Sequence, residues 1–277
     1  MIALVNPQAA KWRYRIPLSV LAIGASLEGH YPYEVLDGNI DANLNANILK
    51  LIAEKNIKYV GMTVMPGPQL VQSINLSKQI KKHFPRVMVI WGGYFPSLHK
   101  TVSANSPYVD YVIRDQGDYS FKKLIDVLEH GGSLETIRGL SYNDGTLKHN
   151  QREDLIDPND LPPMPFHKVD IARYIDKTYI GTRTMNYQSS VGCPFLCGFC
   201  AVAVVYKARW LGLSAERIAN DLLWFQKHYD VNGVEFVYNN FFTSYKRLYE
   251  FSERISGKGI EYWGEGRPDT MLAFEDS

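Results

Sequence analysis

The chain has 277 residues, of which 45% are hydrophobic and 21% are charged, and its formal net charge is +1. This length is sufficient for two domains, and the near-neutral charge excludes a broad attraction to nucleic acid or anionic lipid. No apolar run reaches the ~18 residues of a membrane span, and the amino terminus lacks the pattern of a signal peptide. We therefore expect a cytoplasmic protein with no membrane span and no nucleic-acid partner.

The first 150 residues alternate between short apolar runs and segments with helical apolar spacing. Alternation of this kind with short connections predicts an α/β fold with a doubly wound parallel sheet. The predicted strands are Ile2 to Val5, Tyr33 to Leu36, Tyr59 to Val64, Val87 to Trp91 and Val109 to Ile113. The predicted helices are Leu18 to Leu27, Asn43 to Glu54, Leu70 to Phe84, Pro96 to Ala104 and Tyr119 to Glu129.

Small, polar or glycine-containing stretches follow each of these predicted strands. In doubly wound sheets, ligands bind beyond the carboxyl ends of the strands, and glycine lets the backbone approach a ligand closely. Each stretch alone also fits an ordinary βα turn, but together they favour a cofactor pocket. A Gly-x-Gly-x-x-Gly motif is absent after the first strand, so we do not expect a nicotinamide or flavin dinucleotide. The pocket candidates are Thr63, Met65, Gly67, Gly92, Gly93, Tyr94 and Gly117.

A hairpin and a proline-rich stretch follow this sheet. Gly139 to Asn150 contains an Asp144-Gly145 turn between two short apolar runs, which predicts a hairpin that closes the first domain at residue 150. The prolines that follow disfavour helix and central strand. We predict a packed linker over residues 151–184.

Residues 185–277 return to strand and helix patterns. Strands are predicted at Met185 to Val191, Val234 to Tyr238 and Ile260 to Gly264, and helices at Ala215 to His228 and Tyr245 to Ile255. These βα units resemble the start of a βα barrel, in which the chemistry lies at the carboxyl ends of the strands. Three parallel strands cannot close a barrel. We therefore expect an incomplete barrel in this domain and a chain that is a piece of a longer protein.

All three cysteines lie within eight positions after the first of these strands, as Cys193-Pro194-Phe195-Leu196-Cys197-Gly198-Phe199-Cys200. Iron-sulfur clusters are held by cysteine thiolates, usually four, so three ligands predict a [4Fe-4S] cluster with one iron open to an external molecule. A zinc site is the alternative, but zinc motifs usually come as two separated pairs and no histidine lies in or just after this loop. Such a cluster fits a reducing compartment.

At this point the sequence resembles the radical S-adenosylmethionine enzymes with an N-terminal cobalamin-binding domain. The Cys-x3-Cys-x2-Cys loop with Phe199 before its third cysteine, and the approach Ser190-Val191-Gly192, look like the cluster loop of that family. Earlier stretches resemble its cobalamin domain and linker in order and spacing. These are Pro17 to Ala22, Val89 to Pro96, Val109 to Arg114 and Leu161-Pro162-Pro163.

The resemblance implies a chemistry and a set of site residues. Cys193, Cys197 and Cys200 would bind the cluster, and S-adenosylmethionine would chelate the open iron and be cleaved reductively to a 5′-deoxyadenosyl radical. Methylcobalamin then supplies a methyl group in many members, while others perform ring closures or rearrangements. Phe199 would lie near the adenine, and Asn239, Asn240 and Arg267 would bind the methionine amine and carboxylate, although a solvated turn and a salt bridge are the alternatives for these three. The first-domain pocket candidates would bind cobalamin.

Three features depart from the family pattern. Members often have acidic residues where this chain has Asn239-Asn240, and a Gly-Glu-Gly-Glu-like turn where it has Asp115 to Asp118. An Asp-x-His-x-x-Gly motif is also absent, so a bound cobalamin would lack a histidine from the protein as its lower ligand. These departures affect individual residues and leave the expected fold unchanged.

Our leading hypothesis is a cobalamin-dependent radical enzyme that transfers a methyl group to an unactivated carbon of a small-molecule or peptide substrate, with flavodoxin or ferredoxin as electron donor. A radical oxidative cyclase or rearrangement enzyme is the second hypothesis. A non-catalytic cofactor-binding fragment is the third. The sequence does not identify the substrate.

Overall fold

The computed structural model describes residues 1–9, 14–237 and 240–274 of the chain. The chain divides into two compact units, each described separately below. The first unit comprises Met1–Trp12, Pro17–Asp154 and Leu161–Val169, and the second comprises Arg13–Ile16, Leu155–Asp160 and Asp170–Ser277. Of the helices in the described part of the chain, none has the length and apolar character needed to cross a membrane.

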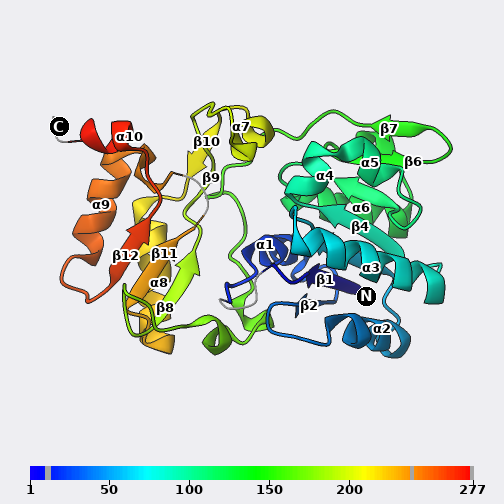
Figure 1. Ribbon diagram of the computed structural model, residues 1–277, viewed down its shortest axis with the longest axis horizontal. Coiled ribbons are helices and arrows are strands. Elements are labelled where there is room, and N and C mark those ends of the chain that lie inside the picture. The colour runs from blue at the N-terminus through cyan, green and yellow to red at the C-terminus, as the bar shows by residue number, and fades with distance from the viewer. Residues whose placement is uncertain (10–13, 238–239, 275–277) are drawn as a thin grey trace. The chain divides into compact units, whose positions relative to one another are not determined.

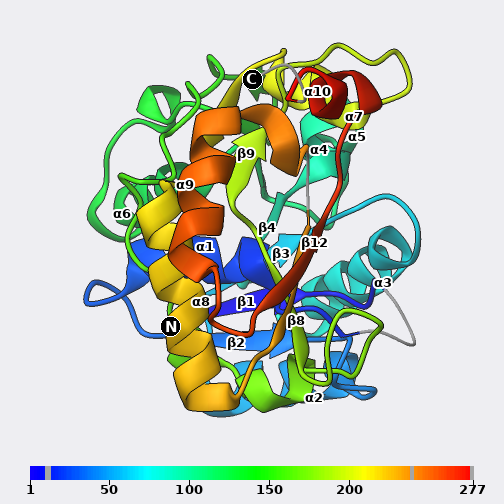
Figure 2. The ribbon, with the colours of Figure 1, turned by 90° about the vertical axis from the view of Figure 1, so that its left-hand side faces the viewer.

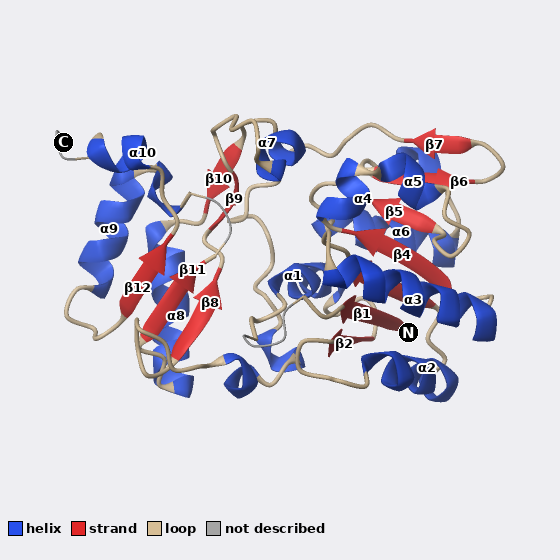
Figure 3. Ribbon diagram, viewed as in Figure 1, coloured by secondary structure: helices blue, strands red, loops and turns tan. Residues whose placement is uncertain are grey.

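The first unit is built on a 7-stranded sheet of order β2-β1-β3-β4-β5-β6-β7. The pairs from β2 to β5 are parallel, and a hairpin adds β6 and β7 in antiparallel orientation (Figure 3). The expected α/β fold with a mostly parallel central sheet is confirmed. The strands are β1 (Ile2–Asn6), β2 (Tyr33–Asp37), β3 (Tyr59–Thr63), β4 (Met88–Gly92), β5 (Tyr111–Ile113), β6 (Leu140–Asn143) and β7 (Leu147–His149).

Helices cover both faces of this sheet, and each face has its own apolar core. Alternate strand residues point to opposite faces, so Ala3 and Val5 pack with one core and Ile2 and Leu4 with the other. The first core includes residues of α2, α3 and α5, and the second includes residues of α1 and α6. These helices are α1 (Leu18–Leu27), α2 (Leu44–Lys55), α3 (Pro68–His83), α5 (Lys100–Ala104) and α6 (Asp118–His130).

The second unit contains a 3-stranded parallel sheet of order β12-β11-β8. The strands are β8 (Thr184–Tyr187), β11 (Gly233–Phe236) and β12 (Glu261–Gly264), and the long helices are α8 (Ala215–Tyr229) and α9 (Tyr245–Ile255). Figure 2 shows α8 and α9 lying side by side along this sheet. Ser214 and Ser244 cap the two helices, since each hydroxyl accepts a hydrogen bond from the backbone N–H three residues later.

Several element boundaries differ from the sequence-based expectation. The helix expected at Pro96 to Ala104 is two short helices, α4 (Tyr94–Leu98) and α5, separated at His99. The strand expected at Met185 to Val191 ends at Tyr187, and β9 (Ser190–Gly192) then pairs antiparallel with β10 (Trp210–Gly212), which was not expected. Short helices α7 (Ala201–Tyr206) and α10 (Pro268–Leu272) were also not expected.

One short segment joins the second unit from far upstream in the sequence. The Ile16 backbone N–H donates to the Asn186 side-chain oxygen at 2.7 Å, and the Asn186 amide donates back to the Ile16 carbonyl at 3.4 Å. Residues 14–16 therefore belong to the second unit, although they lie between β1 and α1 along the chain (Figure 1).

Candidate functional site

The cysteine loop, residues 193–200, connects β9 to α7 at the carboxyl end of β8. Its three thiols are free and partly exposed. A turn joins the second and third cysteines, because the Cys200 backbone N–H donates to the Cys197 carbonyl at 3.0 Å. The loop therefore presents three reduced soft ligands on a short, accessible stretch of backbone.

Gly192 determines how the chain enters this loop. Its φ is +73°, and a Cβ at this position would lie 2.1 Å from the Arg209 carbonyl oxygen, so any side chain would collide with the backbone. This close approach is where β9 pairs with β10, with Gly192 opposite Trp210. The glycine is therefore required for the hairpin that leads into Cys193.

The donor set of the loop fits an iron-sulfur cluster, since cysteine thiolates are the ligands such clusters use and zinc sites are usually four-coordinate. Within the described ranges, no three His, Cys, Asp or Glu side chains are gathered closely enough in this conformation to bind a metal ion. The chemistry of the ligands thus fits the cluster, and the thiols would have to converge to bind it.

Arg267 lies beside the cysteine loop. Its Nη1 donates to the Cys197 Sγ at 3.1 Å, and its guanidinium carbon lies 4.0 Å from the centre of the Phe195 ring. Asp269 accepts from the Nε at 3.0 Å and from Nη2 at 2.6 Å. Those hydrogen bonds raise the pKa of Arg267 above its usual range. The structure thus brings Arg267 together with Cys197, one of the predicted cluster ligands. Arg267 also forms a salt bridge with Asp269.

Two other residues that were predicted to bind S-adenosylmethionine, Asn240 and Phe199, have described positions. Asn240 is 6% exposed, and its side-chain oxygen accepts from the Phe242 N–H at 3.2 Å, which caps the turn η4 (Phe241–Thr243). Its amide nitrogen lies 3.4 Å from the Thr270 hydroxyl oxygen. Phe199 is 94% exposed, which is unusual for a large apolar side chain and leaves its ring available for a ligand. Asn239 lies outside the described residues.

Sequence reasoning missed Arg247, which joins two loops of this edge from α9. Its Nη1 donates to the Ser189 carbonyl and its Nη2 to the Phe241 carbonyl, each at 2.9 Å. Desolvation by burial lowers the pKa of Arg247 to about 10. Another arginine on the same helix, Arg254, is exposed. No sequence signal separates the two, because the difference arises only from what α9 packs against.

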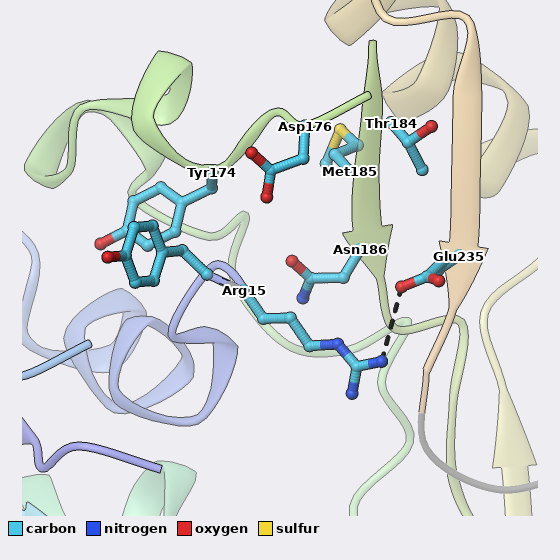
Figure 4. A pocket seen from close by; sticks show the side chains of 8 residues that line it. Arg15, Tyr174, Asp176, Thr184, Met185, Asn186 and Glu235 are labelled. Atoms are coloured by element: carbon cyan, nitrogen blue, oxygen red, sulfur yellow. Dashed lines mark hydrogen bonds and ion pairs between the residues drawn. The ribbon is translucent and has the colours of Figure 1, made fainter. Parts of the chain in front are cut away.

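Figure 4 shows a small pocket against the second sheet, lined by residues of β8 and β11 and by the upstream segment. Glu235 is 4% exposed and lies opposite Asn186 in the β11–β8 register. Arg15 Nη2 lies 3.4 Å from the Glu235 carboxylate (Figure 4). Most of the lining side chains are polar, and the Arg15–Glu235 ion pair is part of the lining.

In the first unit, the predicted pocket residues lie in the loops after β3, β4 and β5. We call these loops the first-sheet edge. Since the three strands are parallel neighbours, their carboxyl ends lie along one edge. Thr63 and Gly92 end their strands, Tyr94 begins α4, and Gly67, Gly93 and Gly117 each directly precede a helix, while Met65 lies in the loop after β3.

Gly93 is the most constrained of these residues. Its φ is +96°, and a Cβ there would lie 3.0 Å from the backbone nitrogen of Val64. The loops after β3 and β4 are in contact at this point, since the Val64 N–H donates to the Gly92 carbonyl at 2.8 Å and the Phe95 N–H donates to the Val64 carbonyl at 3.0 Å. Gly67 also has a positive φ, +95°, but faces open space.

A buried amide network lies where the strand order reverses, between β1 and β3. The Gln69 amide donates to the Asn6 side-chain oxygen at 3.0 Å and to the Pro7 carbonyl at 2.8 Å. Its oxygen accepts from the Met65 N–H at 3.1 Å, and Asn6 in turn donates to Asp37 at 2.9 Å. The bonds of Gln69 fix the β3 loop to the β1 loop in the buried interior, and the Asn6 bond extends the network to the Asp37 carboxylate.

One buried acid belongs to the same edge. Asp118 follows Gly117, begins α6 and is 8% exposed. Burial raises the pKa of its carboxyl. The Ser26 hydroxyl donates to its backbone carbonyl, which attaches the start of α6 to α1.

Comparison with known proteins relates this architecture to characterised families. The B12 binding domain family model matches residues 14–125. An uncharacterised methyltransferase of Pyrococcus horikoshii, PH0819, is 27% identical over 247 residues, covering 88% of this chain and 53% of that protein. The expected resemblance to radical S-adenosylmethionine enzymes with a cobalamin-binding domain is confirmed.

Other relatives of this chain are enzymes with different named activities. The anaerobic magnesium-protoporphyrin IX monomethyl ester cyclase of a Synechocystis species is 23% identical and covers 99% of this chain and 57% of that protein. The cobalamin-dependent radical SAM methyltransferase TokK of Streptomyces tokunonensis is 24% identical over 170 residues, covering 57% of this chain and 24% of its own.

Solved structures show the same fold. The cobalamin-dependent S-adenosylmethionine radical enzyme OxsB, with aqua-cobalamin and S-adenosylmethionine bound, matches with a TM-score of 0.78 at 20% identity. That match covers 94% of this chain and 38% of OxsB. The chain spans about half the length of the first two curated relatives described above, 53% and 57%.

Proposed function

We propose that this chain belongs to an enzyme that uses S-adenosylmethionine, a [4Fe-4S] cluster and cobalamin to transfer a methyl group to an unactivated carbon. The observation that carries the proposal is the occurrence, in one chain, of three free thiols at the carboxyl end of β8 and a B12 binding domain match over residues 14–125. The relatives that are named methyltransferases support the same reaction class.

In the second unit, Cys193, Cys197 and Cys200 would bind the cluster, which when bound supplies the electron that cleaves S-adenosylmethionine. Arg267 would pair with the methionine carboxylate, because its Nη1 already points to the thiol of Cys197 and a guanidinium binds carboxylates well. The Asn240 oxygen has a second lone pair available for the methionine ammonium. Asn239 is proposed to share this role.

The exposed ring of Phe199, the residue before Cys200, offers an apolar surface, and we propose that it packs against the adenine. In the first unit, the residues of the first-sheet edge would bind cobalamin, the methyl carrier. Gly92 and Gly93 keep the backbone free of side chains there, and Thr63, Met65, Gly67, Tyr94 and Gly117 complete the proposed lining. The substrate would be a small molecule or a peptide, and the electron donor a flavodoxin or ferredoxin.

The direct test is anaerobic reconstitution of the purified chain with iron, sulfide and cobalamin. We expect about four iron and four sulfide atoms per chain, as a [4Fe-4S] cluster requires, together with one cobalamin. Addition of S-adenosylmethionine and dithionite should then form 5′-deoxyadenosine. A chain that binds zinc alone and no corrinoid contradicts the proposal.

Oxidative cyclisation is the second candidate, favoured by the Synechocystis cyclase, which aligns with 99% of this chain. The two reactions differ in the fate of the methyl group of S-adenosylmethionine. With a deuterated methyl donor, methyl transfer places deuterium in the product, and cyclisation does not.

A further inference from the structure

Arg247 connects the carboxyl ends of two neighbouring strands through a single side chain. Its Nη1 bonds the Ser189 carbonyl two residues after β8, and its Nη2 bonds the Phe241 carbonyl in the loop after β11, each at 2.9 Å. The strands β8 and β11 are paired up to Tyr187 and Phe236. The guanidinium fork therefore sets the spacing of the two loops just beyond the last strand pair.

The surroundings of Arg247 fit a planar cation. The guanidinium carbon lies 5.0 Å from the centre of the Trp210 ring and 5.5 Å from that of Phe241. A Cβ on Gly212 would lie 2.9 Å from Nη1, so the absence of a side chain at Gly212 leaves space for the fork. Lysine has neither the plane to stack on these rings nor two donors at a fixed spacing.

The charge of Arg247 is not explained by ion pairing. Desolvation is the cause that lowers its pKa, and no described carboxylate contributes to the shift. A half-buried cation without a counter-ion is costly, and an apolar side chain would fill the same space with less cost. What an apolar side chain cannot do is bond two backbone carbonyls at once.

Both bonded loops lead to residues of the proposed S-adenosylmethionine site. Ser189 precedes β9 and the entry to Cys193, and its carbonyl also accepts from the Leu213 N–H at 2.9 Å. Phe241 follows Asn240, and its N–H donates to the Glu265 carbonyl at 2.8 Å, two residues before Arg267. Arg247 is thus bonded to the two backbone segments that lead to the cysteine loop, to Asn240 and, through Glu265, to Arg267.

We infer that Arg247 is a positioning residue that fixes the start of the cysteine loop relative to the Asn240 loop and so preorganises the binding of S-adenosylmethionine. The inference rests on the proposed function for the identity of that ligand. The contacts that carry it, the fork between Ser189 and Phe241 stacked on Trp210, lie within the second unit.

The test compares R247M and R247K with two matched controls in the full chain. R254M removes an exposed arginine from the same helix. F225L opens a cavity at a fully buried ring of α8 and so lowers stability without removing either hydrogen bond of Arg247. Hydrogen exchange at the Leu213 and Phe241 amides is measured without cofactors, well below the unfolding midpoint of every variant. Binding of S-adenosylmethionine to the reconstituted cluster is measured by equilibrium dialysis.

R247M removes one hydrogen bond from a charged group at each loop, so we expect exchange at Leu213 and Phe241 to accelerate about tenfold and S-adenosylmethionine to bind about tenfold more weakly. R247K should fall between R247M and the unmodified chain. R254M and F225L should leave both readouts within about twofold of the unmodified chain, because neither alters the two carbonyls.

Two results overturn the inference. One is R247M with unchanged exchange at both amides, and the other is F225L with the same loss of affinity as R247M, which would make stability the cause. Failure of the proposed function is a separate result, because the unmodified chain would then bind no S-adenosylmethionine at all. Accelerated exchange with normal affinity in R247M would show that the loops move without consequence for the ligand, and it also contradicts the inference.

Discussion

The carboxyl ends of the two parallel sheets in this chain are prepared for ligands in different ways. The first-sheet edge is held by backbone contacts around Gly93 and, toward β1, by the amide network of Gln69. The second sheet ends in reduced thiols and guanidinium groups, with Arg267 in an ion pair and Arg247 bonded to carbonyls. An edge fixed by backbone and amide hydrogen bonds fits a large cofactor that is held in place, and an edge with thiols and guanidinium groups fits a reacting metal site.

The largest effect that would separate the two edges is expected from the cysteines. Replacing Cys193, Cys197 and Cys200 together by alanine removes every thiol of the chain. Iron should fall to background and 5′-deoxyadenosine formation should be lost, while cobalamin binding persists because the first-sheet edge is unchanged. Iron analysis and the cobalamin absorption spectrum measure the two outcomes. Iron retained at the level of the unmodified chain would show that other residues hold the cluster.

G93A, in the first-sheet edge, should have the opposite effect and weaken cobalamin binding without loss of iron. A Cβ there meets the Val64 backbone at 3.0 Å and the positive φ is unfavourable for alanine, so we expect a loss of about 1–3 kcal/mol in stability. Cobalamin should bind at least severalfold more weakly while the iron content stays normal.

G145A is the matched control for G93A, because Gly145 also has a positive φ, +101°, but faces open space in the hairpin turn. It should share the backbone strain without the loss of cobalamin affinity. Equal affinity losses in G93A and G145A would remove the argument that Gly93 shapes the cofactor edge.

Asp118 predicts a pH dependence that belongs to the first unit alone. Burial raises its pKa above the usual value of an aspartate, so the unfolded chain loses this proton at lower pH than the folded chain. Asp118 therefore costs no stability at pH values below its pKa in the unfolded chain. Its cost grows as the pH rises from there toward its pKa in the folded chain. D118N should raise the unfolding midpoint at pH 7, and its advantage should shrink as the pH is lowered. An advantage that is constant with pH would show that the carboxyl does not titrate this way.

The smallest effect is expected from D269N in the second unit. Asp269 and Arg267 form an exposed ion pair, and exposed pairs contribute little to stability. The unfolding midpoint should not change measurably. S-adenosylmethionine should bind a few-fold more weakly, because the guanidinium beside Cys197 loses the partner that orients it. Unchanged affinity would show that Arg267 does not need Asp269.

The sequence predicted the elements whose signals are local. The helices over Leu18–Leu27 and Tyr245–Ile255 have the expected bounds, because Pro17 and Ser244 mark their starts and apolar spacing continues to their ends. The thiols were predicted as cluster ligands for the same reason, since residue type and spacing carry their chemistry, whereas Arg267 was predicted from the family resemblance.

The features that escaped prediction depend on distant contacts. Nothing in the alternation over Met185 to Val191 marks the end of β8 at Tyr187, because the break accompanies the pairing of β9 with β10 about 20 residues downstream. Arg247 resembles Arg254 in sequence, and only the carbonyls of Ser189 and Phe241 make it different. The amide network of Gln69 likewise requires Asn6, more than 60 positions earlier.

The hydrogen bonds between Ile16 and Asn186 have a consequence for how the chain folds, because they join residues 170 positions apart. As the protein is synthesised, the first sheet can form while the backbone groups of Ile16 still lack their partner. The second unit is completed only after Asn186 emerges and the long loop closes, which is a slow, high-contact-order step. For the same reason, a single cut or gene fusion between the two units would separate the second unit from part of its own structure. A fragment that contains the complete second unit would have to include residues 14–16.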